Sequence, residues 1–468
     1  GACLIGLCIF GIRGRTGYNP IKVSAAYFCQ DAFLNQLGVS PTFNLLTSVM
    51  DDMRPENKYL HLMDEQEAIT KAQALLNRPG DANVSPLAVY RRAAKADSVQ
   101  QRRPNVVLIM MESMSAEFMK HFGQSETLTP FLDSLYTRSI SFRNFYSAGI
   151  HTNHGLYATL YSFPAMMKRN LMKGSVIPRY SGLPTVLKEN GYYNLFFMTH
   201  EGQYDNMNAF FRTNGYDEVF SQEDYPADKV VNSFGVQDDF LYDYAIPVLN
   251  QRAATGQPFF ATLLSISNHP PYVIPPFFHP KTSEPETQIV EYADWALRQF
   301  FEEARKQPWF DNTIFVLEGD HGKLVGDAEC ELPESYNHIP LMIYSSRIQP
   351  EEKTTFGGQV DIQPTILGLL NIDYLQNNFG VDLLKEERPC MFYTADNMVV
   401  GRNDTLLYLY NYETQQELTY DIGNGKLNAV PMDDSFLPLK EYSFSMLQSA
   451  EFLVKHGKTL NSIPFTQQ

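Results

Sequence analysis

Short apolar runs alternate with helical patterns from about residue 104 onward. Such alternation is typical of an α/β domain whose central sheet is mostly parallel and flanked by helices. Four runs stop at polar residues that can do chemistry: Asn105–Met111 at Glu112, Asn194–Met198 at Thr199 and His200, Phe259–Ile266 at Ser267 to His269, and Thr313–Leu317 at Glu318 to His321. In open α/β sheets, ligands bind beyond the carboxyl ends of the strands. The pattern therefore predicts that these four strand ends converge on one edge of the sheet.

Helical segments are expected around these strands. Leu128–Leu135 has a proline near its start, Gly182–Gly191 ends on a glycine, and Glu291–Arg305 is amphipathic. On the N-terminal side, Asp64–Leu76 combines good helix formers with an apolar stripe. Toward the C-terminus we expect a hairpin of two strands followed by a closing helix, at residues 403–411, 417–421 and 440–456.

The chain has 468 residues, which exceeds one ordinary compact core, so two or three units are expected. The texture of the sequence changes near residues 104 and 396. We predict the end of a membrane anchor with a helical linker region over 1–103. An α/β domain over 104–395 and a small C-terminal α+β subdomain over 396–468 are expected to follow.

The chain opens with an apolar run over Ala2–Ile12, shorter than the roughly twenty residues that span a bilayer. The run can be the end of a transmembrane helix whose earlier part lies outside this sequence. It can equally be the start of a buried strand or helix, and the residues leave both interpretations open. Arg13 and Arg15 directly after the run favour a cytoplasmic flank.

The formal charge of −16, from 37 basic and 53 acidic residues, argues against nucleic acid as a partner. A phosphate backbone requires a basic face. The charge is compatible with a small anionic substrate, because a metal ion can supply the local positive charge. The five cysteines show no CxxC and no regular spacing, so they indicate neither a zinc ribbon nor a disulfide framework.

Asp320 and His321 place an oxygen and a nitrogen ligand side by side at one strand end, and Glu112 adds a carboxylate at another. Mn²⁺, Zn²⁺ and Mg²⁺ accept such a mixed set of ligands. A turn with a capping aspartate is the alternative interpretation of Asp-His-Gly. The neighbouring strand ends with similar residues favour the metal site.

Thr152 lies just before Leu156–Tyr161, which reads as helical. It is therefore expected near a helix N-terminus, where backbone N–H groups and the helix dipole favour anions. An ordinary threonine N-cap is the alternative. A metal-bound hydroxyl in this place can also accept a phosphoryl group as an alkoxide.

Six motifs follow one another along the chain: Asn105–Ser113, the loop with Thr152, Ser267–Tyr272, Glu318–Gly322, His338–Tyr344 and Val360–Leu367. Their order resembles the alkaline phosphatase/sulfatase superfamily, over roughly residues 104–395. Within it, the chain looks most like the lipoteichoic acid synthase-type phosphoglycerol transferases. The resemblance implies one divalent metal, Mn²⁺ before Zn²⁺ or Mg²⁺, and four ligands for it: Glu112, Thr152, Asp320 and His321.

The resemblance further implies that Thr152 is the catalytic nucleophile and that His269 contacts the phosphate or glycerol of the substrate. The expected activity moves a phosphoglycerol-type group from an anionic phospholipid donor to a glycan or lipid acceptor, through a covalent phosphothreonine. Members of the family are typically anchored by N-terminal membrane helices and work in the periplasm or at the cell surface. This placement conflicts with the signal from Arg13 and Arg15, and we adopt it over that signal.

Two departures from the family patterns matter. Sulfatases need a Cys/Ser-x-Pro-x-Arg motif, whereas this chain has Thr152-Asn-His-Gly-Leu156, which disfavours ordinary sulfate-ester hydrolysis. Lipoteichoic acid synthases carry an arginine after the equivalent of His200, and residues 201–207 contain none. Phosphoethanolamine transfer, phosphodiester hydrolysis and sulfuric-ester hydrolysis therefore stay as alternatives. A non-catalytic ectodomain that retains the metal is a further alternative, from another class.

Four more residues are expected to contact substrate: Asn153, His200, Asp205 and His338. A structural role for His338 is an equally good interpretation. One of His151 and His154, which flank Thr152, is expected to contact substrate and the other to pack or face solvent. Asp361 is expected to cap a helix that begins near Gln363.

Overall fold

The computed structural model describes residues 1–16, 20–29, 32–54, 58–77, 91–93, 103–174, 177–423 and 425–461. Its centre is an eight-stranded sheet in the order β5-β4-β6-β2-β7-β8-β3-β9. The strands are β2 Asn105–Met111, β3 Ile140–Tyr146, β4 Tyr193–Met198, β5 Glu218–Phe220, β6 Phe259–Leu264, β7 Thr313–Gly319, β8 Leu341–Tyr344 and β9 Glu351–Gly358. All run in one direction except β8, which is antiparallel to both of its neighbours. The predicted α/β class with a mostly parallel sheet is confirmed.

The central strands are apolar throughout because both of their faces are covered. In β2, Val106, Leu108 and Met110 face one hydrophobic core, while Val107 and Ile109 face the other. Six of the described helices contribute to the first core: α4 Glu65–Leu76, α6 Thr152–Tyr161, α7 Leu183–Glu189, α8 Met207–Thr213, α11 Ile362–Leu369 and α12 Leu437–Lys455. Three contribute to the second: α5 Pro130–Tyr136, α9 Asp238–Ala253 and α10 Pro285–Ala304. The expected helices over 128–135, 182–191 and 291–305 are confirmed as α5, α7 and α10, with shifted ends.

A second, antiparallel sheet follows the eight-stranded sheet along the chain. Its strands pair in chain order: β11 Met391–Ala395, β12 Met398–Arg402, β13 Leu406–Asn411, β14 Gln416–Gly423 and β15 Lys426–Ala429. The predicted hairpin is β13 with β14, and the predicted closing helix is α12 Leu437–Lys455. A small ribbon joins β1 Arg91–Ala93 to β10 Tyr374–Gln376.

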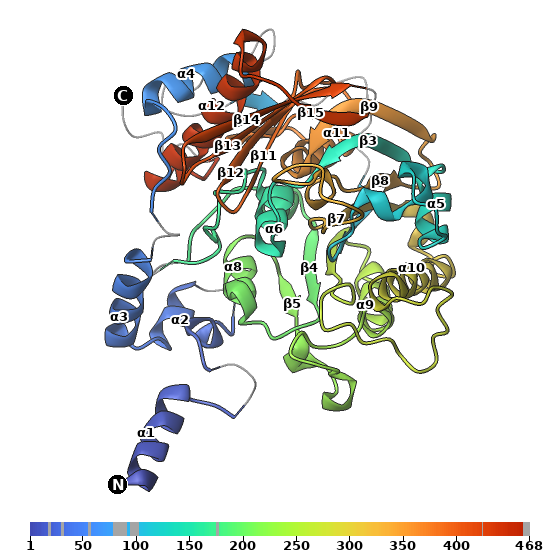
Figure 1. Cartoon of the computed structure of the whole chain (residues 1–468). Helices are drawn as coiled ribbons and strands as arrows, with labels where there is room; N and C mark the ends of the chain where they lie inside the picture. The colour runs from blue at the N-terminus through green and yellow to red at the C-terminus, as the bar shows by residue number, and fades with distance from the viewer. Residues whose placement is uncertain are drawn as a thin grey trace.

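The early helix α4 Glu65–Leu76 packs against α12 beside the second sheet (Figure 1). The backbone N–H of Leu62 donates to Gln448 Oε1 over 2.7 Å. Ala68, Ile69 and Ala72 of α4 are fully buried. The predicted boundaries at 103/104 and 395/396 stay predictions, and residues 78–90 and 94–102 of the expected linker lie outside the described residues.

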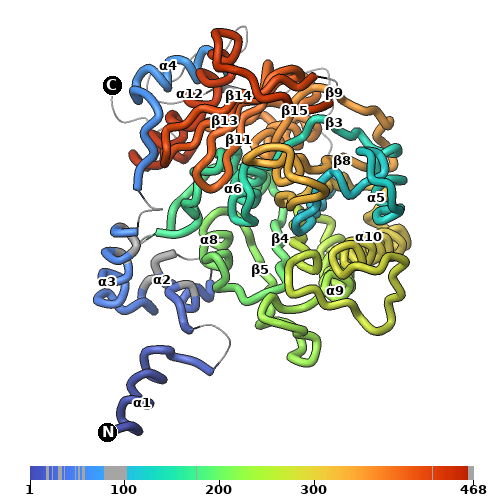
Figure 2. The backbone as a smooth tube through the Cα atoms, viewed as in Figure 1, coloured from blue at the N-terminus to red at the C-terminus, as the bar shows by residue number. Residues whose placement is uncertain are grey.

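The first helices lie to one side of the molecule, as the tube in Figure 2 shows. They are α1 Ala2–Arg13, α2 Ala32–Leu37 and α3 Pro41–Asp52. α1 buries none of its residues, so the interpretation of the first apolar run as a buried element is wrong. In the described part of the chain, no helix combines the length and the apolar character needed to cross a membrane.

Candidate metal centre and active site

The four predicted strand ends meet at one edge of the sheet, because β4, β6, β2 and β7 are consecutive parallel neighbours. Glu112 directly follows β2, and Asp320 directly follows β7. Met111 and Gly319 are in register, and the backbone N–H of Asp320 donates to Met111 O over 3.0 Å. The sheet therefore fixes the separation of the two carboxylates.

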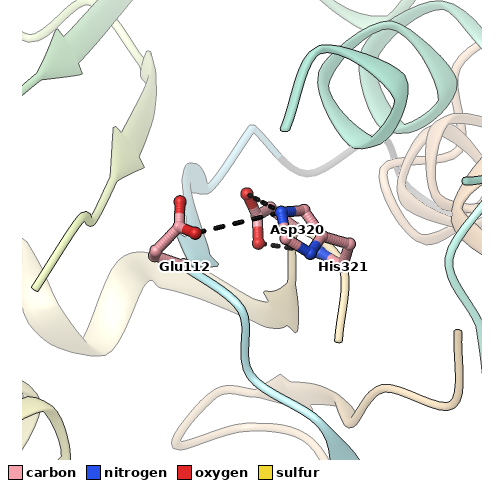
Figure 3. A group of neighbouring side chains, drawn as sticks. All are labelled: Glu112, Asp320 and His321. Atoms are coloured by element: carbon pink, nitrogen blue, oxygen red, sulfur yellow. Dashed lines mark hydrogen bonds and ion pairs between the residues drawn. The ribbon is translucent and has the colours of Figure 1, made fainter. Parts of the chain in front are cut away.

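Glu112, Asp320 and His321 form a compact cluster in which one ligand atom from each lies within 4.8 Å of the others (Figure 3). His321 Nε2 is 3.9 Å from Glu112 Oε1 and 3.7 Å from Asp320 Oδ2. Both carboxylates are buried, with exposed fractions of 1% and 0%. Two buried carboxylates this close repel each other unless a positive charge lies between them.

Hydrogen bonds orient the cluster. Ser113 donates from Oγ to Glu112 Oε1 over 2.6 Å and from its backbone N–H to Asp320 Oδ1 over 2.8 Å. The second oxygen of Asp320, Oδ2, is buried and has no hydrogen-bond partner among the described residues. His321 Nδ1 lies 2.8 Å from Gly322 O, and a carbonyl only accepts, so this nitrogen carries the proton. Nε2 then presents its lone pair to the two carboxylates, which is the tautomer that a metal ligand requires.

The electrostatics of Glu112 point the same way. Burial raises the pKa of Glu112 well above its ordinary value, and the neighbouring Asp320 carboxylate raises it further. A divalent cation between the carboxylates would offset both effects. The donor set of two carboxylates and one imidazole, with an unpaired buried oxygen, therefore fits a divalent ion such as Mn²⁺, Zn²⁺ or Mg²⁺.

Thr152 is the first residue of α6, as predicted, and it lies beside the cluster. Its hydroxyl donates to Glu112 Oε2 over 3.5 Å. The N-cap residue of α6 is His151, and no side chain caps the helix there. The interpretation of Thr152 as an ordinary N-cap is therefore wrong, because its hydroxyl faces the carboxylate and not its own helix.

Asn153 and Asp205 lie together next to Thr152. Asn153 Nδ2 donates to Asp205 Oδ2 over 3.3 Å, and Lys173 Nζ lies 3.0 Å from Asp205 Oδ1. The Oδ1 atom of Asn153 is buried without a partner among the described residues. The amide of Asn153 is thus held by Asp205 beside Thr152, the predicted nucleophile, and its Oδ1 atom can still accept a hydrogen bond.

The histidines expected to contact substrate differ in their surroundings. His200 is buried, which lowers its pKa to about 4, and Nδ1 lies 3.2 Å from Glu201 O. His269 is half-buried, and burial lowers its pKa while the nearby Asp320 raises it. Both are neutral at pH 7 on this basis. Their substrate contacts stay predictions.

His338 is bonded within the protein at both ring nitrogens. Nδ1 lies 2.8 Å from Glu117 Oε1, and Nε2 donates to Arg143 O over 2.8 Å. Burial lowers its pKa, but the Glu117 carboxylate outweighs burial and the net shift is upward. This bonding is that of a structural histidine, the second of the two interpretations.

Asp361 precedes α11, but its carboxylate does not cap that helix, so the expected capping role is wrong. Its oxygens accept from the buried Arg388, with Nε 2.9 Å from Oδ2. They also accept from the backbone N–H groups of Gly358 and Val381. A cation distant in sequence competes successfully for this carboxylate, which no local pattern reveals.

Two side chains near the site, Lys323 and Asp396, were not predicted from the sequence as parts of it. Lys323 lies two residues beyond His321 and donates from Nζ to Asn268 Oδ1 over 2.6 Å. Asp396, in the turn between β11 and β12, lies 2.8 Å from His151 Nε2. The sequence could have indicated Lys323, because it directly follows the Asp-His-Gly motif, but no local pattern indicates Asp396.

His154, two residues after Thr152, is fully buried, and neither of its ring nitrogens is bonded among the described residues. Burial lowers its pKa to about 3, so the imidazole is neutral. The exposed His151 is the flanking histidine on the solvent side. The expectation that one of these two histidines contacts substrate stays a prediction.

A family model described as Sulfatase matches residues 104–372. The chain belongs to the sulfatase family. Among curated proteins, it is 25% identical over 350 residues to lipoteichoic acid synthase 1 of Bacillus subtilis (strain 168), covering 69% of this chain and 53% of that protein. It is 24% identical over 367 residues to the lipoteichoic acid synthase of Staphylococcus saprophyticus, with 71% and 54% covered. This sulfatase-family chain thus spans about half the length of these relatives.

Solved structures agree with this membership. A protein in the alkaline phosphatase superfamily from Vibrio parahaemolyticus superposes with a TM-score of 0.77 at 26% identity, covering 87% of this chain and 100% of that one. The lipoteichoic acid synthase LtaP from Listeria monocytogenes gives a TM-score of 0.66 at 19% identity, with 83% and 98% covered, and shows the shared fold. The resemblance drawn from the sequence motifs is confirmed, and the sulfatase-family core carries an additional C-terminal antiparallel sheet.

Proposed function

We propose that this protein is an extracytoplasmic, metal-dependent phosphotransferase that moves a phosphoglycerol-type group from a phospholipid donor to a glycan or lipid acceptor. One observation carries the proposal: the Thr152 hydroxyl, at the start of α6, lies 3.5 Å from Glu112 Oε2 in the cluster with Asp320 and His321. A hydroxyl nucleophile beside a candidate metal centre is the arrangement that a covalent phosphoryl intermediate requires.

The metal would be held by Glu112, Asp320, His321 and Thr152 Oγ1, and when bound it supplies Lewis-acid polarisation of the phosphoryl oxygens and lowers the pKa of the hydroxyl. The remaining work falls to the chain. Since Thr152 Oγ1 donates to Glu112 Oε2, the hydroxyl proton already points at a carboxylate that can receive it.

In the first half-reaction, the bond between Thr152 Oγ1 and phosphorus forms while the bond from phosphorus to the diacylglycerol oxygen breaks. The alcohol leaves with one proton, which balances the proton lost by Thr152. In the second half-reaction, the acceptor hydroxyl attacks phosphorus, Thr152 is released and takes up the acceptor's proton. Positioning and charge stabilisation make up most of what phosphoryl transfer requires.

The proposed membrane location has support from the N-terminal helices. Among the described residues up to Tyr59, seventeen large apolar side chains are exposed, including Leu45, Leu46 and Met50 of α3 with exposed fractions of 65%, 60% and 65%. Exposed apolar patches of this kind mark protein or membrane contacts. We propose that these helices lie against lipid and so bring a phospholipid donor to the site.

A second candidate, phosphoethanolamine transfer at the same site, is favoured by the segment after His200. This segment contains the acidic residues Glu201 and Asp205 and no arginine up to Met207. Asp205 contacts Asn153 beside the nucleophile. Asp205 is paired with Lys173 and Glu201 with Arg15, so an ammonium head group would take the place of one of these cations, which a glycerol head group cannot do.

The test is a search for the covalent intermediate. Mn²⁺-loaded protein is incubated with phosphatidylglycerol or phosphatidylethanolamine, and adducts on Thr152 are sought by intact-mass and peptide mass spectrometry. A glycerophosphate-sized adduct that is absent in Thr152→Ala is expected. A phosphoethanolamine-sized adduct would establish the second candidate. No adduct with any phosphodiester donor, despite bound metal, would overturn transfer and favour a binding ectodomain.

A further inference from the structure

Lys323 is a cation held inside the active-site edge of the sheet. Its Nζ atom donates to Asn268 Oδ1 over 2.6 Å and to Tyr272 Oη over 3.2 Å. It also lies 5.3 Å from the centre of the Phe118 ring and 4.9 Å from that of Tyr272. These direct contacts of the ammonium group are all with neutral groups.

No carboxylate among the described residues forms an ion pair with Lys323. The two buried arginines are different, because Arg169 pairs with Glu451 and Arg388 with Asp361. The Glu112 and Glu286 carboxylates act on Lys323 only from beyond ion-pair distance, and a largely desolvated charge without a directly bonded counter-charge is costly unless a ligand supplies one. An ammonium group has three N–H donors, and the described residues supply it with two acceptors. One donor is left for a ligand.

The position of the ammonium fits a substrate anion. Lys323 follows His321 of the cluster by two residues, and Asn268, to which its Nζ donates, directly precedes His269, the predicted substrate contact. Lys323 is therefore close to both the cluster and the place where the substrate is expected. Asn268, which holds Nζ, is itself fixed by donating to Ser113 O over 3.0 Å.

The backbone at Lys323 is also fixed. Its N–H donates to Ser115 Oγ over 2.9 Å, and the same hydroxyl donates to Lys323 O over 3.0 Å. The preceding Gly322 packs so tightly that a Cβ atom would lie 2.0 Å from Ser335 O. Because this backbone is already ordered, little conformational entropy is lost when the lysine binds an anion.

We propose that Lys323 donates its free N–H to a non-bridging phosphoryl oxygen of the phosphodiester, and so provides the counter-charge of the substrate. The inference rests on the proposed function and adds to it a residue that recognises the phosphate. Two carboxylates, Glu112 and Asp320, balance a divalent ion, so the single negative charge of a phosphodiester needs one more cation. Residues 201–207 supply no arginine for this purpose.

The test measures anion binding separately from turnover. Inorganic phosphate is titrated by calorimetry into Mn²⁺-loaded wild type, Lys323→Met and Lys323→Arg. A hydrogen bond to a charged group is worth about 1.5–3 kcal/mol, so Lys323→Met should weaken phosphate binding about 10- to 100-fold. Lys323→Arg, which keeps the charge, should stay within about tenfold of wild type. The exposed Lys306→Met serves as the matched control and should not change phosphate binding.

Melting curves and Mn²⁺ titrations without phosphate show whether each variant folds and keeps its metal. Unchanged phosphate affinity in a folded, metal-binding Lys323→Met would overturn the inference, as would a wild type that binds no phosphate. The two proposals fail separately. If Lys323→Met weakens phosphate binding but no Thr152 adduct forms in wild type, the anion site stands and transfer falls. If the adduct forms and phosphate affinity does not depend on Lys323, the reverse holds.

Discussion

Asp320 shows how a single side chain can indicate a bound ion. Its Oδ1 accepts backbone hydrogen bonds from Ser113 and His321. Its Oδ2 is buried, receives no hydrogen bond from the part of the chain that the structure describes, and lies 3.7 Å from His321 Nε2. A buried carboxylate oxygen left unpaired is unfavourable unless a cation takes the place of the missing donor. The geometry of this residue supports a metal more directly than the Asp-His-Gly motif does.

Replacing Asp320 by Asn removes one negative charge and keeps the size of the side chain. Mutating a residue that only hydrogen-bonds to a metal ligand typically lowers metal affinity about 10- to 100-fold. Weakening a ligand itself should therefore lower Mn²⁺ affinity by at least about 100-fold. Isothermal titration with Mn²⁺ measures the change, and the exposed Asp311→Asn is the control. Equal Mn²⁺ affinity in Asp320→Asn and wild type would contradict the assigned site.

At the scale of elements, the strands that could be predicted from the sequence are those with apolar neighbours on both faces of the sheet. β2, β4, β6 and β7 are apolar runs buried on both faces, and the polar residues that end them mark the functional edge. Glu112, Asp320 and His321 could be predicted because they directly follow such runs. Neither β8, whose four residues carry no sign of direction, nor the pairing of Asp396 with His151 could be predicted. Both depend on contacts between segments far apart in the chain.

The start of α5 is held by a residue from another helix. Asp294 of α10 accepts from the backbone N–H groups of Phe131 and Leu132, each over 2.9 Å. Burial raises the pKa of Asp294 to about 7, although these two hydrogen bonds lower it. Because the pKa is higher in the folded than in the unfolded state, the stabilising effect of protonation is complete below about pH 4 and is lost as pH rises to about 7.

Asp294→Asn removes this titration. The melting temperature of wild type minus that of the variant should fall as pH increases from about 4 to about 7 and then level off. The underlying slope is at most about 1.4 kcal/mol per pH unit. Thermal melts of both proteins across this range measure it, with Asp311→Asn as a non-buried reference. A difference that does not vary with pH would show that Asp294 is ionised in the folded protein.

At the scale of the whole molecule, the exposed apolar surface is strongly uneven. α1 and α3 together carry half of the large apolar side chains that are exposed in the described part of the chain, and both lie on the side of the molecule away from the second sheet (Figure 1). The backbone carbonyl of Tyr27, which follows α1, accepts a hydrogen bond from the side-chain amide of Asn208 in α8. This N-terminal segment therefore contacts the domain that is built on the eight-stranded sheet. The apolar surface is thereby linked to the half of the molecule that contains the candidate site.

Sedimentation with phosphatidylglycerol vesicles tests whether this surface binds lipid. Serine at Leu45, Leu46 and Val49 removes three exposed apolar side chains of α3 and should weaken partitioning at least about tenfold. The matched control places serine at three other exposed apolar positions: Val231, Phe277 and Leu437. Equal losses in the two variants, or none in the first, would contradict a specific lipid-facing role for α3.

The packing of α12 on α4 has a consequence for how the molecule is made. During synthesis, residues 65–76 leave the ribosome several hundred residues before residues 437–455, yet each helix covers the apolar face of the other. The strands that carry Glu112 and Asp320 can pair before α12 exists, because both precede it. The apolar face of α4 stays exposed until α12 has been synthesised and can pack against it. A chain interrupted before residue 437 would therefore expose that surface to chaperones and proteases, while the metal cluster could already be assembled.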